Sequence, residues 1–253
     1  MIQKMDSEIV IKKIQTKADM DVCLDINKAT FDPKYLTFSK YGSNGVKEIL
    51  GLEIQNPFSI YNFLVAKCDD TIVGFAELRE EFPSIFLNWF AVDANYQGKK
   101  IGKIFLDNII ETNRANGFNE LKLNVFKSNI KALNFYKKYL LINVEEKNVC
   151  RLTSNQKGNK LIFYVVNYHQ VISDKEKFGF VYIRVLFEKK IIDIVCVNDI
   201  LFFPTGDNDL LNIGLNLLDK FGLKDIYFFC EKDKEVLLNY EVIDGIYTLV
   251  MNL

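Results

Sequence analysis

Hydrophobic residues recur along the chain with two different periods, and this pattern predicts an α/β protein. Short apolar runs and alternating positions predict strands at residues 9–14, 63–67, 72–78, 85–92 and 121–125, and again near 141–144 and 161–166. Apolar residues three and four positions apart predict helices over 16–29, 103–116 and 129–139. The order of these elements predicts one sheet covered by helices.

The strand at 85–92 leads through a glycine-containing loop into the helix at 103–116. The loop and first helical residue are Gln97, Gly98, Lys99, Lys100, Ile101, Gly102 and Lys103. A strand–loop–helix junction points backbone N–H groups and the positive end of the helix dipole at one place, which suits a phosphate. Three lysines add positive charge there. Taken alone, the loop is also compatible with an ordinary turn carrying solvated lysines.

A second motif lies about thirty residues further on, at the start of the helix predicted over 129–139. Asn129, Ala132, Phe135 and Tyr136 follow the pattern Asn-x-x-Ala-x-x-Phe-Tyr. The two motifs, in this order and at this distance, make residues 8–165 resemble the GCN5-related N-acetyltransferase (GNAT) family. That family also carries an Arg/Gln-x-x-Gly-x-Gly/Ala loop, whose ends Gln97 and Gly102 match. Lys100 stands where the middle glycine is usual.

The resemblance implies a GNAT acyl-CoA N-acyltransferase fold, classed as α/β (α+β), with a mixed, mostly antiparallel central sheet flanked by helices. It implies acetyl-CoA as co-substrate, with its pyrophosphate on the loop from Gln97 to Lys103. The backbone of Phe90, Ala91 and Val92 would bind the pantetheine arm. The acceptor amine would attack the thioester directly, in a ternary complex. The cofactor contacts implied by the second motif involve Asn129, Ala132, Phe135 and Tyr136.

The same resemblance, with the chemistry of the side chains, gives candidates for the catalytic groups. Tyr136 is the candidate general acid for the departing thiolate, because a phenol has a higher reference pKa (~10) than a thiol (~8.5). An aromatic packed beside Phe135 is the alternative. Asn129 either binds the cofactor or caps the helix. Glu77 is the candidate base, and the other acidic candidates are Glu80, Glu81 and Asp93. A solvated surface carboxylate is the alternative interpretation of each, and a water chain could also remove the proton.

The remainder of the chain resembles a second, degenerate copy. With an ungapped shift of 105 positions, a hairpin, strand, loop, helix, strand and second helix recur, and Gly117 falls on Gly222. Gly102 falls on Asp207 and Tyr136 on Glu241, so we expect no CoA site there. The predicted domains are 1–166 and 167–253, the second lacking the first strand and two early helices. Its apolar strands need cover from the first domain or from a second chain in a homodimer.

Composition narrows the partners. Hydrophobic residues make up 49% of the chain and its net charge is −1, which gives no reason to expect nucleic acid or a membrane as partner. Five scattered cysteines favour reduced thiols in the cytoplasm, and neither a metal-ligand spacing nor a Ser-His-Asp set occurs. His169, the single histidine, is interpreted as a linker or surface residue.

Residues 32–58 occupy the segment that shapes the acceptor site in the family. They are aromatic and polar with few carboxylates, which disfavours a strongly polycationic acceptor. A small-molecule or peptide amine is the expected acceptor. The competing class is a non-catalytic acyl-CoA-binding or interaction module, because Lys100 replaces a usual glycine. Transfer of a longer acyl group, or transfer to oxygen, also stays open.

Overall fold

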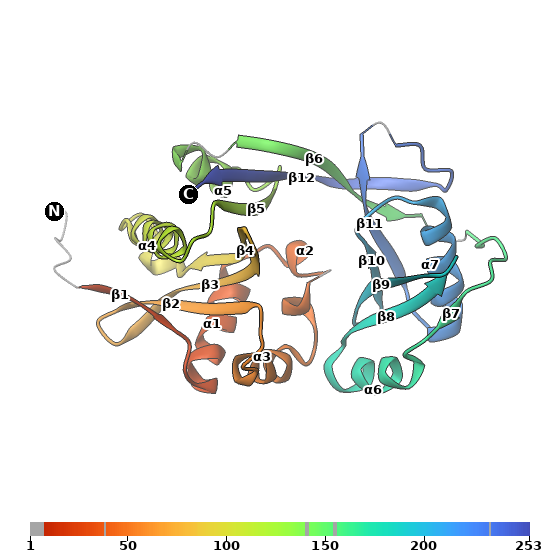
Figure 1. The fold of residues 1–253 in the computed structure, drawn as a ribbon, viewed down its shortest axis with the longest axis horizontal. Helices are drawn as coiled ribbons and strands as arrows, with labels where there is room; N and C mark the ends of the chain where they lie inside the picture. Colours follow the sequence, from red (N-terminus) through yellow and green to blue (C-terminus); the bar gives the residue numbers. More distant parts are fainter. Residues whose placement is uncertain (1–7, 38, 140–141, 154–155, 233) are drawn as a thin grey trace.

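The computed structural model describes residues 8–37, 39–139, 142–153, 156–232 and 234–253, which form two halves joined by one continuous sheet (Figure 1). The elements of the first half are β1 (Ile9–Lys13), α1 (Lys17–Thr30), α2 (Pro33–Leu36), η1 (Lys40–Gly42), α3 (Val46–Gln55), β2 (Tyr61–Cys68), β3 (Thr71–Glu81), β4 (Ser84–Val92), η2 (Ala94–Tyr96), α4 (Ile101–Ala115), β5 (Glu120–Phe126), α5 (Ile130–Tyr136), η3 (Lys137–Tyr139) and β6 (Ile142–Leu152). Those of the second are β7 (Tyr164–Val165), α6 (Tyr168–Phe178), β8 (Phe180–Phe187), β9 (Lys190–Val197), β10 (Ile200–Phe203), α7 (Asn208–Phe221), β11 (Asp225–Glu231) and β12 (Tyr240–Asn252).

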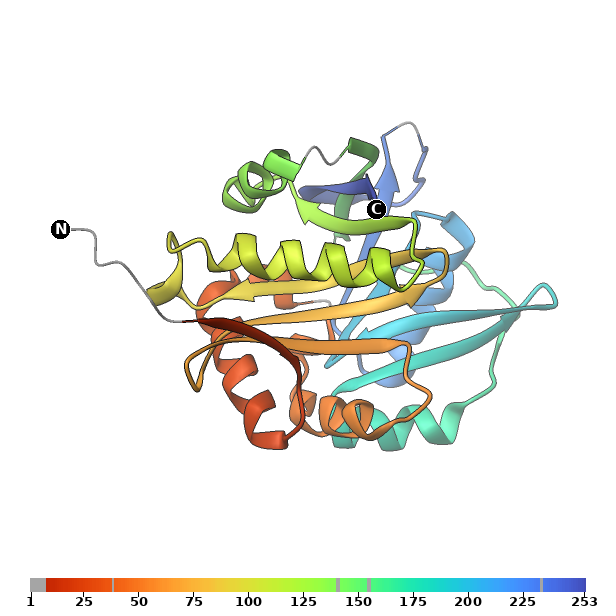
Figure 2. The same ribbon diagram turned by 60° about the vertical axis from the view of Figure 1, so that its left-hand side comes forward.

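Helices cover both faces of the first half of the sheet. The helix α4 lies across one face, where Phe105 and Ile109 join the core that includes Leu121 and Leu123 of β5 (Figure 2). The helices α1 and α3 pack on the other face, against alternate residues of β2 and β3. Thr16 caps α1 through a capping box with Asp19, which confirms the predicted helix start. The mixed, mostly antiparallel sheet with flanking helices is the predicted fold class.

The parallel strands β4 and β5 part from each other halfway along. They pair only from Ser84 with Glu120 to Leu87 with Leu123. Beyond this point β4 continues to Val92 along β3, while β5 continues to Phe126 along β12. A strand whose neighbour diverges presents backbone N–H and C=O groups to whatever enters the gap. The fold therefore creates an opening beside residues 88–92.

The two halves exchange strands. The C-terminal strand β12 lies between β5 and β6 of the first half, and β6 in turn lies between β12 and β11 of the second. The prediction that residues 161–166 supply the last strand of the first unit is wrong. Only Tyr164 and Val165 are extended there, and they pair with β8 at the far edge. The strand predicted near 141–144 is β6, and Leu141 lies outside the described residues.

The second half repeats the topology of the first, with corrections to the predicted alignment. The shift of 105 positions relates β5 to β11 and most of α4 to α7. The shift places β4 on β9, but the parallel pair β4–β5 corresponds to the parallel pair β10–β11. The predicted alignment of the strands before the loop is therefore wrong by one strand. The expected second helix is absent from the described residues 234–239, which form a loop before β12. A short first strand, β7, and one helix, α6, are present. The boundary at 166/167 stays a prediction.

Only one face of the second half carries helices among the described residues. Side chains of α6 and α7 share a core with alternate residues of β8 to β11, such as Ile183 and Phe228. Because strand side chains alternate in direction, their neighbours Tyr182 and Tyr227 lie on the opposite face of these strands. This face of the sheet is turned toward the first half (Figure 1). Three hydrogen bonds close the base of the interface: Gly45 N–H to Phe178 O (2.8 Å), Asn198 Nδ2 to Gly42 O (3.0 Å) and Asn44 N–H to Asn198 Oδ1 (3.2 Å).

We predict that a chain ending after Asn239 does not fold as a soluble protein. It lacks β12 alone, which leaves the facing edges of β5 and β6 unpaired and exposes the core around Leu249. Size-exclusion chromatography and circular dichroism measure the outcome. A soluble, compact product would contradict the inferred dependence on strand exchange.

A matched pair of point variants isolates the packing contribution of β12. Leu249 is 7% exposed on β12, whereas Leu237 is 75% exposed in the preceding loop. Leu249→Asp should lower the free energy of unfolding by several kcal/mol, since it buries a charge, and Leu237→Asp by less than about 0.5 kcal/mol.

Candidate active site

The loop predicted to bind phosphate lies at the mouth of the opening between β4 and β5. Lys100 is the N-cap of α4, with φ 65°, and its side chain makes no capping hydrogen bond. Gly98 also has a positive φ, 78°. The first N–H groups of an uncapped helix point outward and attract anions. The positive φ of Lys100 explains why the family motif has glycine here: a lysine can adopt this conformation only at a cost of about 1 kcal/mol.

Gln97 links the end of β4 to the start of α5. Its Nε2 donates to the backbone oxygen of Val92 at 2.8 Å, and its Oε1 accepts from Lys131. Lys99 lies over the ring of Tyr96, 4.8 Å from the centroid. Lys103 pairs with Asp107 one turn further along α4 at 2.5 Å. Side-chain contacts thus hold the loop in place, and Gln97 connects it to β4 and α5.

Gly102 lies in the first turn of α4, where it faces the opening. A Cβ built on it would lie 3.6 Å from the ring of Phe135 and 3.7 Å from a methyl group of Val92, which is ordinary van der Waals contact. The rings of Phe135 and Phe90 are stacked at 6.0 Å. Helix α4, β4 and α5 therefore converge on Gly102. Ile101 beside it is 1% exposed and packs into the core, so only its backbone is available to a ligand.

The structure places the second motif at the start of α5. Asn129 is the N-cap, and its Oδ1 accepts from the N–H of Ala132 at 3.1 Å, so the capping alternative is confirmed. Ala132 and Phe135 pack against the core that contains Tyr136. Tyr136 is 7% exposed, and burial raises the pKa of its phenol. A raised pKa keeps this group protonated at neutral pH, as a proton donor requires.

Glu77 lies on the opposite face of the sheet, enclosed by three donors. Its side chain has no exposed area. The Tyr41 hydroxyl and the Asn88 amide each donate to it at 2.5 Å, and Lys40 Nζ lies 2.9 Å away. Burial and the charge of Glu77 raise the pKa of Tyr41. The carboxylate is therefore fully occupied, and a proton can reach it only through one of these partners. Of the other acidic candidates, Glu80 accepts from Asn62 and Asp93 caps η2.

The equivalent helix terminus in the second half carries its own anion. Asp207 is the N-cap of α7, and its carboxylate accepts from the N–H groups of Asp209 and Leu210 at 3.0 Å. A Cβ on Gly206 would lie 3.1 Å from Val236, so the loop after β10 is filled by neighbouring side chains. The carboxylate of Asp207 thus occupies the anion position at this helix terminus, and the loss of the CoA site from the second half stays a prediction.

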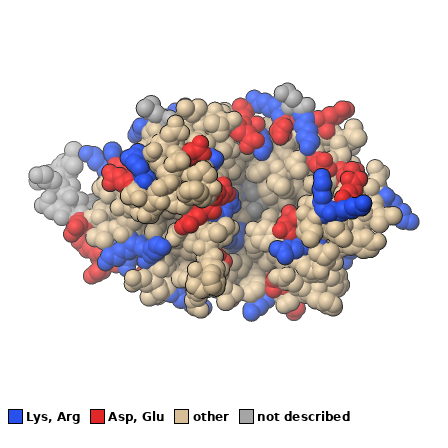
Figure 3. Space-filling view, viewed as in Figure 1, with Lys and Arg blue, Asp and Glu red and all other residues tan. Residues whose placement is uncertain are grey.

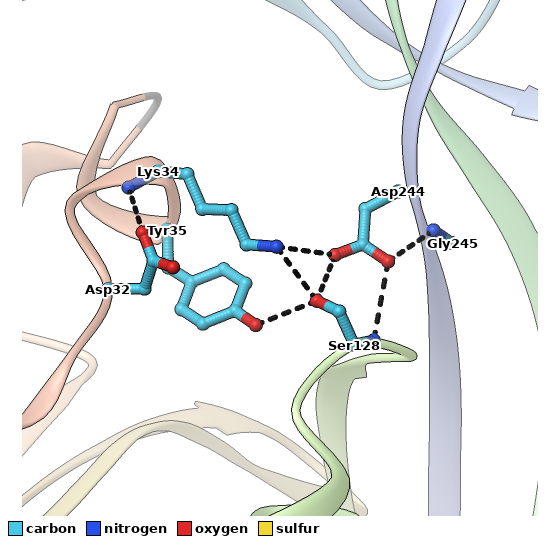
Figure 4. A network of polar contacts seen from close by, with 6 residues as sticks. All are labelled: Asp32, Lys34, Tyr35, Ser128, Asp244 and Gly245. Atoms are coloured by element: carbon cyan, nitrogen blue, oxygen red, sulfur yellow. Dashed lines mark hydrogen bonds and ion pairs between the residues drawn. The ribbon is translucent and has the colours of Figure 1, made fainter.

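A polar network joins the halves where β5 ends (Figure 4). Asp244 of β12 accepts from the hydroxyl of Ser128, and Lys34 Nζ lies 3.3 Å from the same carboxylate and 2.9 Å from Ser128 Oγ. The Tyr35 hydroxyl lies 2.8 Å from Ser128 Oγ, and its ring stacks on Phe126 at 4.4 Å. Burial alone would raise the pKa of Asp244, but hydrogen bonds from Ser128, Gly245 and Lys34 lower it. Segment 32–58 thus contacts the second half directly.

The two halves face each other across a hollow with acidic and basic side chains along its edge (Figure 3). Near the polar network of Figure 4, the hollow is lined by Tyr35 and Phe126 from the first half and by Tyr227 and Asp244 from the second. Tyr182 lies near enough to Arg79 and Glu77 for their charges to affect its pKa, which burial raises. Lys34, Asp244 and Tyr182 were not predicted from the sequence, because no local motif marks a residue whose partners lie about a hundred or more positions away.

The comparisons with known proteins agree with this geometry. Residues 34–140 match the model of the acetyltransferase (GNAT) family. The matched segment of the first half contains the loop and the α5 motif and borders the opening between β4 and β5. No curated protein matches the chain.

Solved structures extend the likeness to the whole chain. A tandem GNAT protein from the clavulanic acid biosynthesis pathway is 9% identical, with 97% of this chain and 98% of that chain covered and a TM-score of 0.62. A glucosamine N-acetyltransferase region of a fungal multi-domain GH3 β-N-acetylglucosaminidase is 12% identical, covering 97% and 38%, with a TM-score of 0.66. The PaiA N-acetyltransferase of Thermoplasma acidophilum, in complex with coenzyme A, is 25% identical, covering 54% and 91%, with a TM-score of 0.47. The fold is thus that of a tandem GNAT protein.

None of the described helices combines the length and apolar character needed to cross a bilayer. No group of three or more His, Cys, Asp or Glu side chains in the described residues is arranged to hold a metal ion. His169 lies on the exposed surface of α6, beside Tyr168.

We predict that Gly102→Val weakens acetyl-CoA binding more than tenfold, or about 1.4 kcal/mol, while the protein still folds. The new Cβ fits, but the added methyl groups enter the space between Phe135, Val92 and the proposed position of the pyrophosphate. Calorimetry measures the affinity. Gly51→Val in α3 is the control, because a Cβ at Gly51 meets nothing within 4 Å. Equal affinity in both variants would refute the assignment of the loop.

We predict that Lys100→Gly raises the free energy of unfolding by about 0.5–1 kcal/mol and weakens acetyl-CoA binding severalfold. Glycine relieves the positive φ but removes a cation from the anion site. Lys189→Gly is the control, since Lys189 has the same φ of 65° in the β8–β9 turn. It should gain similar stability with unchanged affinity, measured by urea unfolding and calorimetry. A loss of stability in Lys100→Gly would show that its conformation carries no strain.

Proposed function

We propose that the protein is an acetyl-CoA-dependent N-acetyltransferase that transfers the acetyl group to a primary amine. The observation that carries this proposal is the uncapped terminus of α4, with three lysines around it, at the mouth of the opening between β4 and β5. The terminus of α4 suits the pyrophosphate of acetyl-CoA. In the opening, the backbone of Phe90, Ala91 and Val92 offers hydrogen bonds to the pantetheine arm. The domain match to the GNAT family supports the same ligand.

The proposed reaction is a direct attack on the thioester within a ternary complex. A backbone N–H of β4 stabilises the developing oxyanion, because donors fixed in a buried strand need no reorganisation. Tyr136 donates its proton to the departing thiolate. Its burial among apolar side chains of the core keeps the phenol neutral until that step. The acceptor amine approaches from the opposite face of the sheet, where Glu77 lies.

We further propose that the acceptor is a small amine bound in the hollow between the halves. Strands of the second half form one wall of this hollow, and a hydrogen bond from Gly45 to Phe178 helps to close its base. Exposed rings such as Tyr182 suit an acceptor with apolar or aromatic groups beside its amine. A homodimer and a cytoplasmic location stay predictions from the sequence.

An acceptor panel distinguishes an enzyme from an acyl-CoA-binding module, which is the competing function. The full chain is mixed with acetyl-CoA and a set of amino acids, arylalkylamines, polyamines and peptides, and the release of free thiol is followed. An enzyme releases thiol in an amine-dependent, saturable way. Tight binding of acetyl-CoA without thiol release for any amine would favour the binding module instead.

We predict that Tyr136→Phe lowers kcat by about 10² or more and leaves the affinity for acetyl-CoA nearly unchanged, since only the proton donor is lost. Because burial raises the pKa of Tyr136, its acid form persists as the pH rises. The wild-type kcat should therefore show no loss from this group between about pH 6 and 9. Steady-state kinetics over this range measure both effects.

Tyr139→Phe is the matched control, because Tyr139 follows three residues later and its hydroxyl donates to Asp107 at 3.0 Å. It should cost about 1 kcal/mol of stability and leave kcat close to that of the wild type. A Tyr136→Phe protein with full kcat would remove Tyr136 from the role of acid.

A further inference from the structure

Lys40 has the surroundings of a bound ammonium ligand. Its Nζ lies 2.9 Å from the carboxylate of Glu77, and its side chain is 14% exposed. Three rings surround it: Tyr61 with its centroid at 4.2 Å, Phe63 at 5.5 Å and Tyr41 at 5.8 Å. A carboxylate combined with aromatic faces is the arrangement by which proteins bind ammonium groups. Here the occupant is the chain's own lysine, supplied by η1.

Lys40 is the one cationic partner of the Glu77 carboxylate among the described contacts. Tyr41 and Asn88 each donate a hydrogen bond, while Lys40 supplies the charge. The 2.9 Å between Lys40 Nζ and the Glu77 carboxylate is a hydrogen-bonding distance, so a proton can pass directly from the ammonium to this carboxylate. Lys40 therefore has beside it the acid–base partner that an amine needs to become a nucleophile.

The Lys40 cage, formed by Glu77 and the rings of Tyr41, Tyr61 and Phe63, lies next to the proposed position of the thioester. The pairing of β3 with β4 shifts between Glu77–Trp89 and Leu78–Leu87, so Asn88 is the bulged residue. Asn88 is also the first residue of β4 beyond its last pair with β5, where the opening begins. Its side chain donates to Glu77, so a single side chain links the cage to the opening.

We propose that Lys40 is an acetylation site of the enzyme itself, with its amine as an intramolecular acceptor. The inference rests on the proposed function. The Lys40 ammonium gives one proton to Glu77, and the amine attacks the thioester carbonyl carbon. A C–N bond forms, the C–S bond breaks, and its electron pair leaves on sulfur. The amine loses a second proton as the amide forms, and Tyr136 protonates the thiolate. One acetyl-CoA yields one acetyl-lysine, one CoA thiol and one released proton.

Burial makes the selectivity of this reaction diagnostic. Acetyl-CoA in solution reacts slowly with exposed lysines such as Lys100 and Lys138, and most slowly with shielded, ion-paired ones. Lys67 is a matched case, 26% exposed and paired with Asp19 at 3.4 Å, but without an aromatic cage. Unassisted chemistry therefore modifies Lys40 no faster than Lys67, whereas the proposed reaction modifies Lys40 faster than Lys67.

The test incubates the full chain with acetyl-CoA and no added amine, and follows each lysine by peptide mass spectrometry. We expect Lys40 to be acetylated at least tenfold faster than Lys67, at a rate that saturates with acetyl-CoA and does not depend on protein concentration. Glu77→Gln and Tyr136→Phe should each slow this acetylation at least tenfold. Lys40→Arg keeps a cation beside Glu77 and should lose the modification while still binding acetyl-CoA.

The outcomes separate this proposal from the proposed function. An unmodified Lys40 in a protein that releases thiol with amines overturns the proposal and leaves the N-acetyltransferase intact. Acetylation of Lys40 no faster than Lys67, without saturation, also overturns it, as unassisted chemistry. If no amine causes thiol release and Lys40 also stays unmodified, both this proposal and the proposed function are overturned.

Discussion

The exchange of β6 and β12 is the constraint on which the rest of the structure depends. Each strand lies in the sheet of the other half, so neither half closes its own sheet. The exchange fixes the separation of the halves and thereby the hollow between them. It also gives β5 a full-length partner on one edge, which lets its other edge part from β4 after Leu123 without loss of support. The proposed cofactor opening thus depends on a strand from the end of the chain.

The two halves show how one helix terminus can keep or lose an anion site. In the first half, Lys100 caps α4 without a side-chain hydrogen bond, in a strained conformation. In the second, Asp207 satisfies two N–H groups of α7 with its own carboxylate. The second half instead forms one wall of the hollow. Its face with Tyr182 and Tyr227 is turned toward the first half, and Asp244 of its strand β12 forms an ion pair with Lys34.

Local sequence signals predicted the parts of the structure that local physics determines. The capping residues Thr16 and Asn129, the α4 loop and the degeneracy at Asp207 were all readable from spacing and residue type. Strand pairing was not, because it depends on partners distant in the sequence: the apolar run at 161–166 looked like a strand, but β12 has the length to span β5. The Lys40 cage was missed for the same reason, since its members come from η1, β2, β3 and β4.

The stoichiometry of acetyl-CoA binding to the full chain tests the central claim most directly, because the claim is that one of two related halves retains the site. Isothermal titration calorimetry on the intact protein measures it without an acceptor. The account predicts one acetyl-CoA per chain, bound by the first half. Two per chain would show that Asp207 does not block the second half, and none would show that the opening between β4 and β5 is not a cofactor site.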